Sequence, residues 1–331
     1  MHRVKCFLTV LLGLSLLAGP AVAREIVVNA VAPTSDDYAL AVVWSNLQAR
    51  TGSENTLTVV DNGTVKGLRL LAQQRIDVSV LGSPHYLDAV SGKGKFKDDP
   101  EKLVANYKNM KALFAIRTST GQYVARTDSG IKEFADLRGK KFAVGRPGGN
   151  AGRVTKALLT VHGIDMEKDA DAQYLKYSQA FESMSNNTMD ATFVWGGIPQ
   201  AAIDNASRTM KLRFVSPDPA KLTEFRKLIT NGDYYVFQNV PAETLKKAYD
   251  GRVEVDSDIQ FWTFPFMFMV NDSMPEDVAY EITKTLWSNI AEVNNTSLAL
   301  SLVSPETALD ALSADLHPGA ARYFKEVGML K

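Results

Sequence analysis

The sequence predicts a mixed α/β protein whose strands and helices form two lobes with a ligand cleft between them. Three observations support this fold class. Apolar strands alternate with helices from residue 24 to 117, the same alternation returns from 118 to about 216, and glycine-rich turns follow several strands. Ligands bind at the carboxyl ends of the strands in such sheets, so these turns are expected to face the cleft.

The first 23 residues are expected to be a secretory signal peptide. A basic start precedes an apolar run at 7–18, and Ala21-Val22-Ala23 offers a cleavage site before Arg24. The run is short for a membrane anchor, which needs about 20 apolar residues. We therefore expect a periplasmic mature chain that begins at Arg24.

The first lobe is expected to contain three strands, at 25–31, 55–63 and 76–83, with helices at 33–52 and 64–75 between them. The last two strands alternate apolar and polar residues, and the second helix has an apolar face. Strands separated by helices at this spacing predict a parallel sheet.

The rest of the chain repeats these signals. Strands are expected at 108–118 and 121–127, a helix after the turn at 145–153, and a helix, turn and strand over 178–197. Further predicted elements are a helix at 198–207, strands at 233–240 and 259–270, and helices at 277–293 and 317–328. The apolar run 261–270 contains Pro265, so we interpret it as a buried strand pair or strand edge rather than a membrane segment.

Composition argues against several functions. The formal net charge is zero, with 45% hydrophobic and 22% charged residues, so there is no basic field for nucleic acid. The one cysteine, Cys6, lies in the signal segment, which leaves no disulfide or thiolate site. His85, His162 and His317 are scattered, and no zinc or Gly-x-Ser-x-Gly motif is present. A binding protein without metal or cofactor fits better than an enzyme.

The turn at 145–153 is a candidate anion cradle. Gly148 and Gly149 let a backbone approach a ligand closely, the following helix begins with free amides, and Arg146 and Arg153 flank the turn. Neither the phosphate-binding loop nor the dinucleotide fingerprint matches. Ordinary turn chemistry is the alternative.

Two further glycine-containing turns connect a strand to a helix in the same way. Asn62 and Gly63 precede Thr64, whose hydroxyl can cap a helix or face the cleft. Gly196 and Gly197 follow Trp195, which is either a core residue or a wall of the pocket.

The sequence also resembles a known family. "DSGIKEFADLRGKKFAVG" is similar to the second-lobe entry of type II periplasmic solute-binding proteins. The segments "DNGTVKGLRLLAQQRIDVSVLGS", "YKNMKALFAI", "RPGGNAGRVTKALL", "MDATFVWGGIPQAAI" and "LHPGAARYFKEVG" resemble the TAXI branch of the TRAP (tripartite ATP-independent periplasmic) transporter binding proteins. The similarity covers most of the mature chain.

This resemblance implies capture of a small organic anion, either a carboxylate such as a dicarboxylate or 2-oxoacid, or an amino acid. Delivery would be to an ion-gradient-driven TRAP carrier, without ATP. It also implies a discontinuous first lobe (24–117 plus 217–331) and a second lobe at 118–216, with hinges at Ile116–Arg117 and Phe214–Val215. We expect a monomer. The alternatives are a secreted enzyme on the same scaffold, a sensor subunit, or the binding protein of an ATP-driven importer.

The family turns and the residue patterns together give the candidate ligand residues. They are Thr34, Ser35, Tyr38, Asn62, Gly63, Thr64, Ser83, Arg146, Gly148, Gly149, Asn150, Arg153, Trp195, Gly196 and Gly197. The sequence departs from the family in the first loop, which is glycine-rich with paired tyrosines in relatives, and in the longer second-lobe turn. Here the first loop carries Asp36 and Asp37, which either begin a helix or pair with a ligand ammonium.

Overall fold

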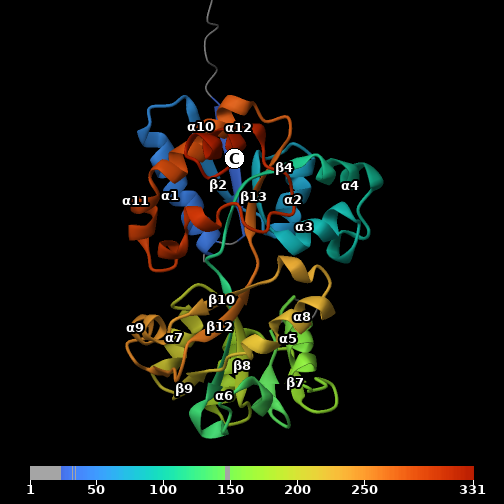
Figure 1. The fold of residues 1–331 in the computed structure, drawn as a ribbon, viewed down its shortest axis with the longest axis vertical. Coiled ribbons are helices and arrows are strands. Elements are labelled where there is room, and N and C mark those ends of the chain that lie inside the picture. The colour runs from blue at the N-terminus through green and yellow to red at the C-terminus, as the bar shows by residue number, and fades with distance from the viewer. Residues whose placement is uncertain (1–23, 32, 34, 146–149) are drawn as a thin grey trace, which may run out of the picture.

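The structure is a computed structural model that describes residues 24–331 except 32, 34 and 146–149. Two α/β lobes lie one above the other along the long axis, and the chain crosses between them twice (Figure 1). Each lobe has its own sheet. The predicted two-lobed α/β architecture is confirmed.

The first lobe contains a five-stranded sheet in the order β2-β1-β3-β13-β4. The strands β1, β2 and β3 are parallel, and β13 lies antiparallel between β3 and β4. The strand bounds are β1 Arg24–Ala30, β2 Asn55–Asp61, β3 Val78–Gly82, β4 Met110–Ile116 and β13 Phe266–Asn271. The helices are α1 Asp36–Arg50, α2 Thr64–Ala72, α3 Ser83–Val90, α4 Glu101–Lys108, α10 Glu276–Ser288, α11 Ile290–Thr296 and α12 Pro318–Glu326.

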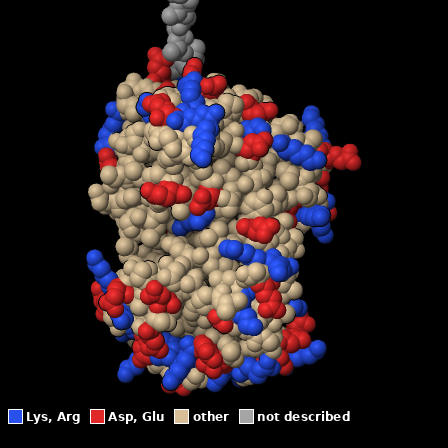
Figure 2. Space-filling view, in the orientation of Figure 1, with Lys and Arg blue, Asp and Glu red and all other residues tan. Residues whose placement is uncertain are grey.

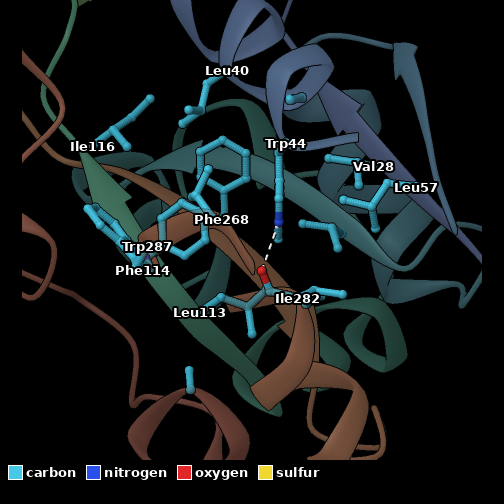
Figure 3. Packing of buried hydrophobic residues seen from close by; sticks show 14 of the residues in the cluster. Val28, Leu40, Trp44, Leu57, Leu113, Phe114, Ile116, Phe268, Ile282 and Trp287 are labelled. Atoms are coloured by element: carbon cyan, nitrogen blue, oxygen red, sulfur yellow. Dashed lines mark hydrogen bonds between the residues drawn. The ribbon is translucent and has the colours of Figure 1, made fainter. Parts of the chain in front are cut away.

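Trp44 of α1 lies at the centre of the first lobe's core (Figure 3). Its ring packs edge-on against Phe114 and Phe268, and these two rings stack with centroids 4.7 Å apart. The indole Nε1 donates a hydrogen bond to the carbonyl of Ile282, at 2.8 Å. Burying the ring and satisfying its only donor together hold α1 and α10 against the same face of the sheet.

The second lobe is built on a larger sheet, with β10-β12-β5-β8-β6-β7 in order; β9 also pairs with β5, and β11 pairs with β9. Its adjacent strands β8, β6 and β7 are parallel, so their carboxyl ends meet at one edge. The strands are β5 Thr120–Arg126, β6 Lys141–Ala143, β7 Asp171–Gln173, β8 Ala191–Gly196, β9 Leu212–Phe214, β10 Val236–Val240, β11 Val253–Glu254 and β12 Ile259–Thr263. The helices are α5 Asn150–Val161, α6 Tyr177–Ser185, α7 Ala201–Ser207, α8 Leu222–Leu228 and α9 Ala242–Ala248.

The second lobe extends further along the chain than expected, because the predicted return to the first lobe after residue 216 does not occur there. The strands β10, β11 and β12 pair within the second sheet, and the chain first rejoins the first sheet at β13. Phe214–Val215 is therefore not a crossing, because β9 pairs with β5 and Val215 is buried in the second lobe. The crossings lie at 117–119 and 264–265, and the Thr263 hydroxyl joins them by donating to the carbonyl of Ser119, at 2.7 Å.

The apolar run at 261–270 is a pair of buried strands that Pro265 separates, and the two strands belong to different sheets. A proline at this point removes one ladder donor where the chain leaves one sheet for the other. Over the part of the chain that the structure describes, no helix has the length and apolar character to cross a membrane.

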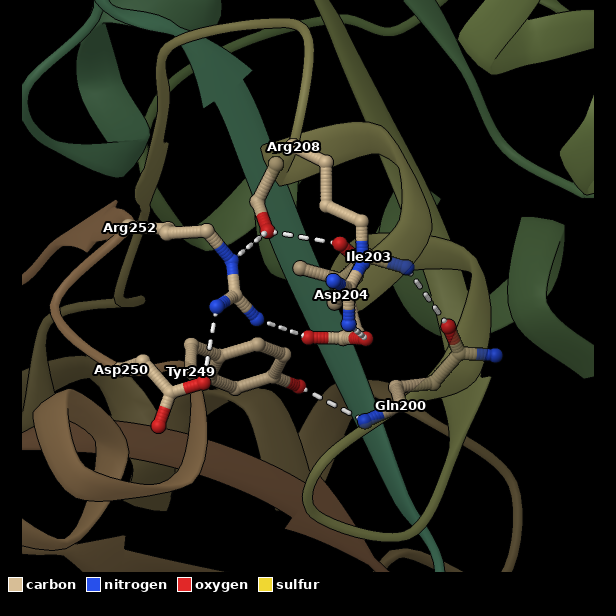
Figure 4. A network of polar contacts seen from close by, with 8 residues as sticks. Gln200, Ile203, Asp204, Arg208, Tyr249, Asp250 and Arg252 are labelled. Atoms are coloured by element: carbon tan, nitrogen blue, oxygen red, sulfur yellow. Dashed lines mark hydrogen bonds and ion pairs between the residues drawn. The ribbon is translucent and has the colours of Figure 1, made fainter.

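A polar network fixes α7 behind the Gly196–Gly197 turn (Figure 4). The Gln200 side chain caps the helix by accepting from the amides of Ala202 and Ile203. The Gln200 amide donates to the Tyr249 hydroxyl at 2.8 Å, and Arg252 pairs with Asp204 of the same helix. The helix that follows β8 therefore has little freedom to shift relative to the sheet.

Candidate ligand-binding site

An aromatic cavity of about 370 Å³ lies at the carboxyl ends of β6, β7 and β8. Both α5 and α6 begin at this cavity, so two helix N-termini face it. It is lined by Gly145, Asn150, Ala151, Lys176, Tyr177, Phe193, Trp195, Trp262, Phe264 and Phe266. The position is the one expected for a ligand in an open α/β sheet, and Phe264 and Phe266 bring the second crossing into its wall.

The aromatic residues of the cavity pack into one continuous wall. Trp195 stacks on Phe264 with centroids 5.1 Å apart, and Phe193 stacks on Trp262 at 5.6 Å. Phe264 also meets the imidazole of His85 edge-on, at 5.3 Å, and lies against Gly82. A Cβ at Gly82 would come within 2.4 Å of the Phe264 ring, so glycine permits this contact between the lobes.

Arg153 and Asn150 form a polar group at the start of α5. The Arg153 guanidinium donates to the Asn150 Oδ1 and to the Tyr235 hydroxyl, both at 2.9 Å, and Tyr235 donates to the same Oδ1 at 2.9 Å. Burial raises the pKa of Tyr235, which keeps its hydroxyl protonated as a donor. The guanidinium is thus oriented by two neutral partners, and no described carboxylate lies within ion-pair distance of it.

A second cavity, of about 590 Å³, forms a groove between the lobes and meets the aromatic cavity at Asn150. Its first-lobe side includes His85, Asp88 and Lys95, and its second-lobe side includes Arg153 and Glu167. Side chains of both charge signs lie on both lobes near this waist (Figure 2). No group of three or more His, Cys, Asp or Glu residues arranged to hold a metal is found among the described residues.

His85 is uncharged in this groove. Burial lowers the pKa of His85 to about 4, and the nearby positive charges of Arg153 and Lys95 act in the same direction. The groove therefore presents a neutral imidazole on one side and a guanidinium on the other. Asp88 has a raised pKa, chiefly because of burial, although Arg153 acts against that rise.

The Gly196–Gly197 turn is positioned by Gln122 of β5, whose side-chain amide donates to both glycine carbonyls at 3.0 Å. A Cβ on Gly197 would lie 2.9 Å from an oxygen of Asp36 and 3.0 Å from Ala299. The glycine thus permits close contact with the first lobe, and the turn adjoins the cavity through Trp195, whose ring lines it.

The first-lobe turn at Asn62–Gly63 is held by Asn29, a fully buried residue of β1. Asn29 accepts from the amide of Asn62 at 2.7 Å and donates to the carbonyl of Gly63 at 3.1 Å. Gly63 has a φ of +74° and is the N-cap of α2, so Thr64 is the first helical residue rather than the cap. None of the three predicted turn residues lines either cavity, although Val65 borders the groove.

Ser83 is also bound within the first lobe. Its hydroxyl donates to the carbonyl of Ala311 at 2.8 Å, its amide donates to Pro265, and its side chain is fully buried. Ser83 therefore helps to hold the C-terminal segment against α3, and it lines neither cavity.

Asp37 has a structural partner. Its carboxylate accepts from the amide of Val31 at 2.7 Å and from the Ser35 side chain. Ser35 is the N-cap of α1, although its side chain makes no cap hydrogen bond to the helix backbone. Tyr38, further along α1, is half-buried and lines neither cavity.

Asp36 joins the first lobe to the first crossing. Its carboxylate accepts from the Ser119 hydroxyl at 2.7 Å and lies against Gly197 of the second lobe. Burial raises the pKa of Asp36, while hydrogen bonds from Ser119 and Thr118 act in the opposite direction. Neither acid lines the aromatic cavity.

Of the predicted site residues, the structure brings Asn150, Arg153 and Trp195 together at the aromatic cavity and its rim. Thr34, Arg146, Gly148 and Gly149 lie outside the described residues. Sequence reasoning missed Tyr235, Lys176, His85 and the aromatic residues at 262–266. The aromatic run itself was visible in the sequence, but it was interpreted only as a core segment.

Comparison with known proteins gives the family. The model of the NMT1-like family matches residues 30–328, so the chain belongs to that family. The sulfonate-binding protein SsuA of Methylobacillus flagellatus KT has a similar fold, with a TM-score of 0.51 at 13% identity over 94% of this chain and 89% of that one.

A TRAP periplasmic solute-binding protein from Rhodobacter sphaeroides gives a TM-score of 0.49 at 11% identity, over 91% of this chain and 92% of that one. The similarity to SsuA, at 13% identity, identifies a shared fold and does not identify a ligand.

Proposed function

We propose that this protein is an extracytoplasmic solute-binding protein that captures a small organic anion between its lobes and delivers it to a membrane carrier. The observation that supports this most directly is the aromatic cavity at the strand ends, with Arg153 oriented at its rim by Asn150 and Tyr235. Family and fold agree with this function.

Binding follows from the physical character of the site. A guanidinium held by neutral partners is already oriented, so an anionic ligand gains charge-assisted hydrogen bonds without first displacing a protein carboxylate. The helix N-termini of α5 and α6 add a further favourable field of about 0.3–1 kcal/mol each. Movement of the lobes about 117–119 and 264–265 would enclose the ligand and remove it from water.

The absence of a catalytic arrangement at the described site favours binding over turnover. The groove holds His85 and Asp88, but Asp88 makes no hydrogen bond or ion pair with His85 among the described contacts. We infer that the ligand leaves unchanged. Incubation with a bound acid followed by chromatography should recover it intact, and a new product would support the enzyme alternative.

The proposal includes a cleaved signal at residues 1–23 and a TRAP carrier of the TAXI type as the partner. The signal is supported by its basic start, apolar run and Ala-Val-Ala site. Intact-mass analysis of secreted protein should give a chain that starts at Arg24. Uptake of ligand into vesicles should require an ion gradient, whereas a requirement for ATP would indicate an importer of the other class.

A thermal-shift panel tests the ligand class directly. Ligand at about 100 times its Kd should add about 2.7 kcal/mol to the free energy of unfolding. Organic carboxylates and sulfonates are expected to raise the melting temperature, while nucleotides and metal salts are not. Stabilisation by nucleotides with no response to any organic anion would refute the proposed function.

A further inference from the structure

We propose that the ligand is a small aromatic monoanion, an aryl carboxylate or aryl sulfonate, whose ring lies in the aromatic cavity. Its charged group would face Asn150, Arg153 and Lys176. This inference rests on the proposed function and narrows its ligand class. It excludes amino acids and organic cations as the principal cargo.

The lining of the cavity selects for a flat ring. Six of the ten lining residues that the structure describes are aromatic, and none of these ten is Leu, Ile, Val or Met. Aromatic pairs gain attraction from offset or edge-on ring contacts beyond what burial of area provides. A saturated chain or ring of equal size gains only the free energy of burying its apolar surface. The aromatic wall therefore favours a flat aromatic ligand over a saturated one of the same size.

The volume limits the size of that ring. At about 370 Å³ the cavity lies near the lower end of the range for small-molecule sites, roughly 300–1,000 Å³. One ring, or two fused rings with a short acidic arm, suits such a space.

The arrangement of the rings argues against a cation. Trp195 lies parallel to Phe264 within 19°, and Phe193 lies parallel to Trp262 within 17°, at stacking distance in both pairs. Rings that cover one another make a wall, whereas a cation cage needs several ring faces directed at one empty centre. The one charged side chain in the described lining is also positive, that of Lys176.

An amino acid would lack a partner for its ammonium group. No carboxylate occurs in the described lining of the cavity. Asp36 and Asp37, the two acids that the sequence suggested for this role, have other partners: Asp37 accepts from the amide of Val31 and Asp36 from the hydroxyl of Ser119. A buried ammonium without a counter-charge is strongly unfavourable.

Three matched ligand pairs test this proposal by titration calorimetry on the mature chain. Benzoate against cyclohexanecarboxylate varies flatness at constant charge, and benzoate against benzylammonium varies the sign of the charge. The pair 3-phenylpropionate and phenylalanine differs only by an ammonium group. We expect benzoate to bind about two- to tenfold more tightly than its saturated analogue, and both ammonium compounds to bind at least about tenfold more weakly than their partners.

Two variants connect the preference to the cavity. Trp195→Leu should bring the ratio of benzoate to cyclohexanecarboxylate affinity close to one, while Phe237→Leu, a half-buried aromatic of the same lobe outside the cavity lining, should preserve it. Lys176→Met changes an exposed residue and should weaken both carboxylates by a similar factor.

The outcomes separate the two levels of the proposal. Equal or tighter binding of cyclohexanecarboxylate, or tighter binding of phenylalanine, would overturn the aromatic-monoanion assignment and leave the solute-binding function standing. If no organic anion of any kind binds, the proposed function itself fails.

Discussion

The two lobes use similar strand–turn–helix units, but the polar groups of those units have different partners. In the first lobe, the turn after β2 is held by Asn29, and Ser83 after β3 donates to Ala311. In the second lobe, Arg153 at the start of α5 has only neutral partners, and Lys176 at the start of α6 lines a cavity. The difference shows that a turn's sequence does not define its role, because residues far away in the chain decide which groups remain available.

The largest expected effect comes from the second-lobe side of this comparison. Arg153→Met should weaken binding of an organic anion by about 10- to 100-fold, because a hydrogen bond to a charged group contributes roughly 1.5–3 kcal/mol. Titration of wild type and variant with benzoate measures this. Lys168→Met is the matched control, since Lys168 is exposed in the same lobe and its one ion pair among the described residues is with Asp165.

Unchanged affinity in Arg153→Met would mean that Arg153 has only a structural role. The contrast drawn between the two lobes would then be wrong. A large loss in Lys168→Met as well would point to the overall field of the lobe rather than to one oriented guanidinium.

Asn29→Ala addresses the first lobe. It should lower the free energy of unfolding by about 1–3 kcal/mol, because the half-buried amide of Asn62 and carbonyl of Gly63 lose their partner, the fully buried Asn29 side chain. Urea unfolding followed by circular dichroism gives this value. Ligand affinity should stay within about twofold of wild type, and a tenfold loss would mean that the turn contacts the ligand.

The groove supplies a pH-dependent prediction. The pKa of His85 is lowered to about 4 in the folded protein from an ordinary value of 6.5, so the unfolded chain takes up the proton first. Stability should therefore fall as the pH drops from 6.5 towards 4, by up to about 3 kcal/mol for this group. His85→Gln should lose less stability over that range. If the stability of both proteins depends on pH in the same way, the pKa of His85 is not lowered in the folded protein and the prediction is wrong.

Ser83→Ala should have the smallest effect. Loss of its hydrogen bond to Ala311 should cost about 1 kcal/mol of stability, since the Ser83 side chain is buried and the Ala311 carbonyl is only partly exposed. Affinity for benzoate should not change. If the affinity for benzoate falls while stability does not, the Ser83 hydroxyl contacts the ligand. The first-lobe turns would then also contribute to ligand binding, as those of the second lobe are proposed to do.

Local signals in the sequence predicted much of the fold. The elements β1–β3, α1 and α2 follow from alternation, caps and glycine, and Gly163, with a φ of +76°, lies just after the end of α5, where a glycine commonly ends a helix. The closing His317–Pro318–Gly319 motif also has a physical reason. His317 caps α12, and a Cβ at Gly319 would lie 2.2 Å from the carbonyl of Glu276.

The parts that could not be predicted depend on pairing between distant segments. No local pattern indicates that β12 pairs with β5 in one sheet while β13, two residues later, enters the other. For the same reason the site was only partly predicted. Arg153 and Trp195 were expected from their turns, but Tyr235 and Phe264 reach the cavity through pairings of the second sheet and the second crossing.

The central position of β13 has a consequence for the order in which the lobes can be completed during synthesis. All strands of the second sheet lie within 120–263, but the first sheet has a gap between β3 and β4 until residues 266–271 have been made. The lobe that begins the chain is thus the last to close, against the usual N-terminal-first order of folding. A nascent chain would hold β1 to β4 without their central partner until most of it has left the ribosome, and that delay would suit the proposed export of the chain through a membrane before it folds.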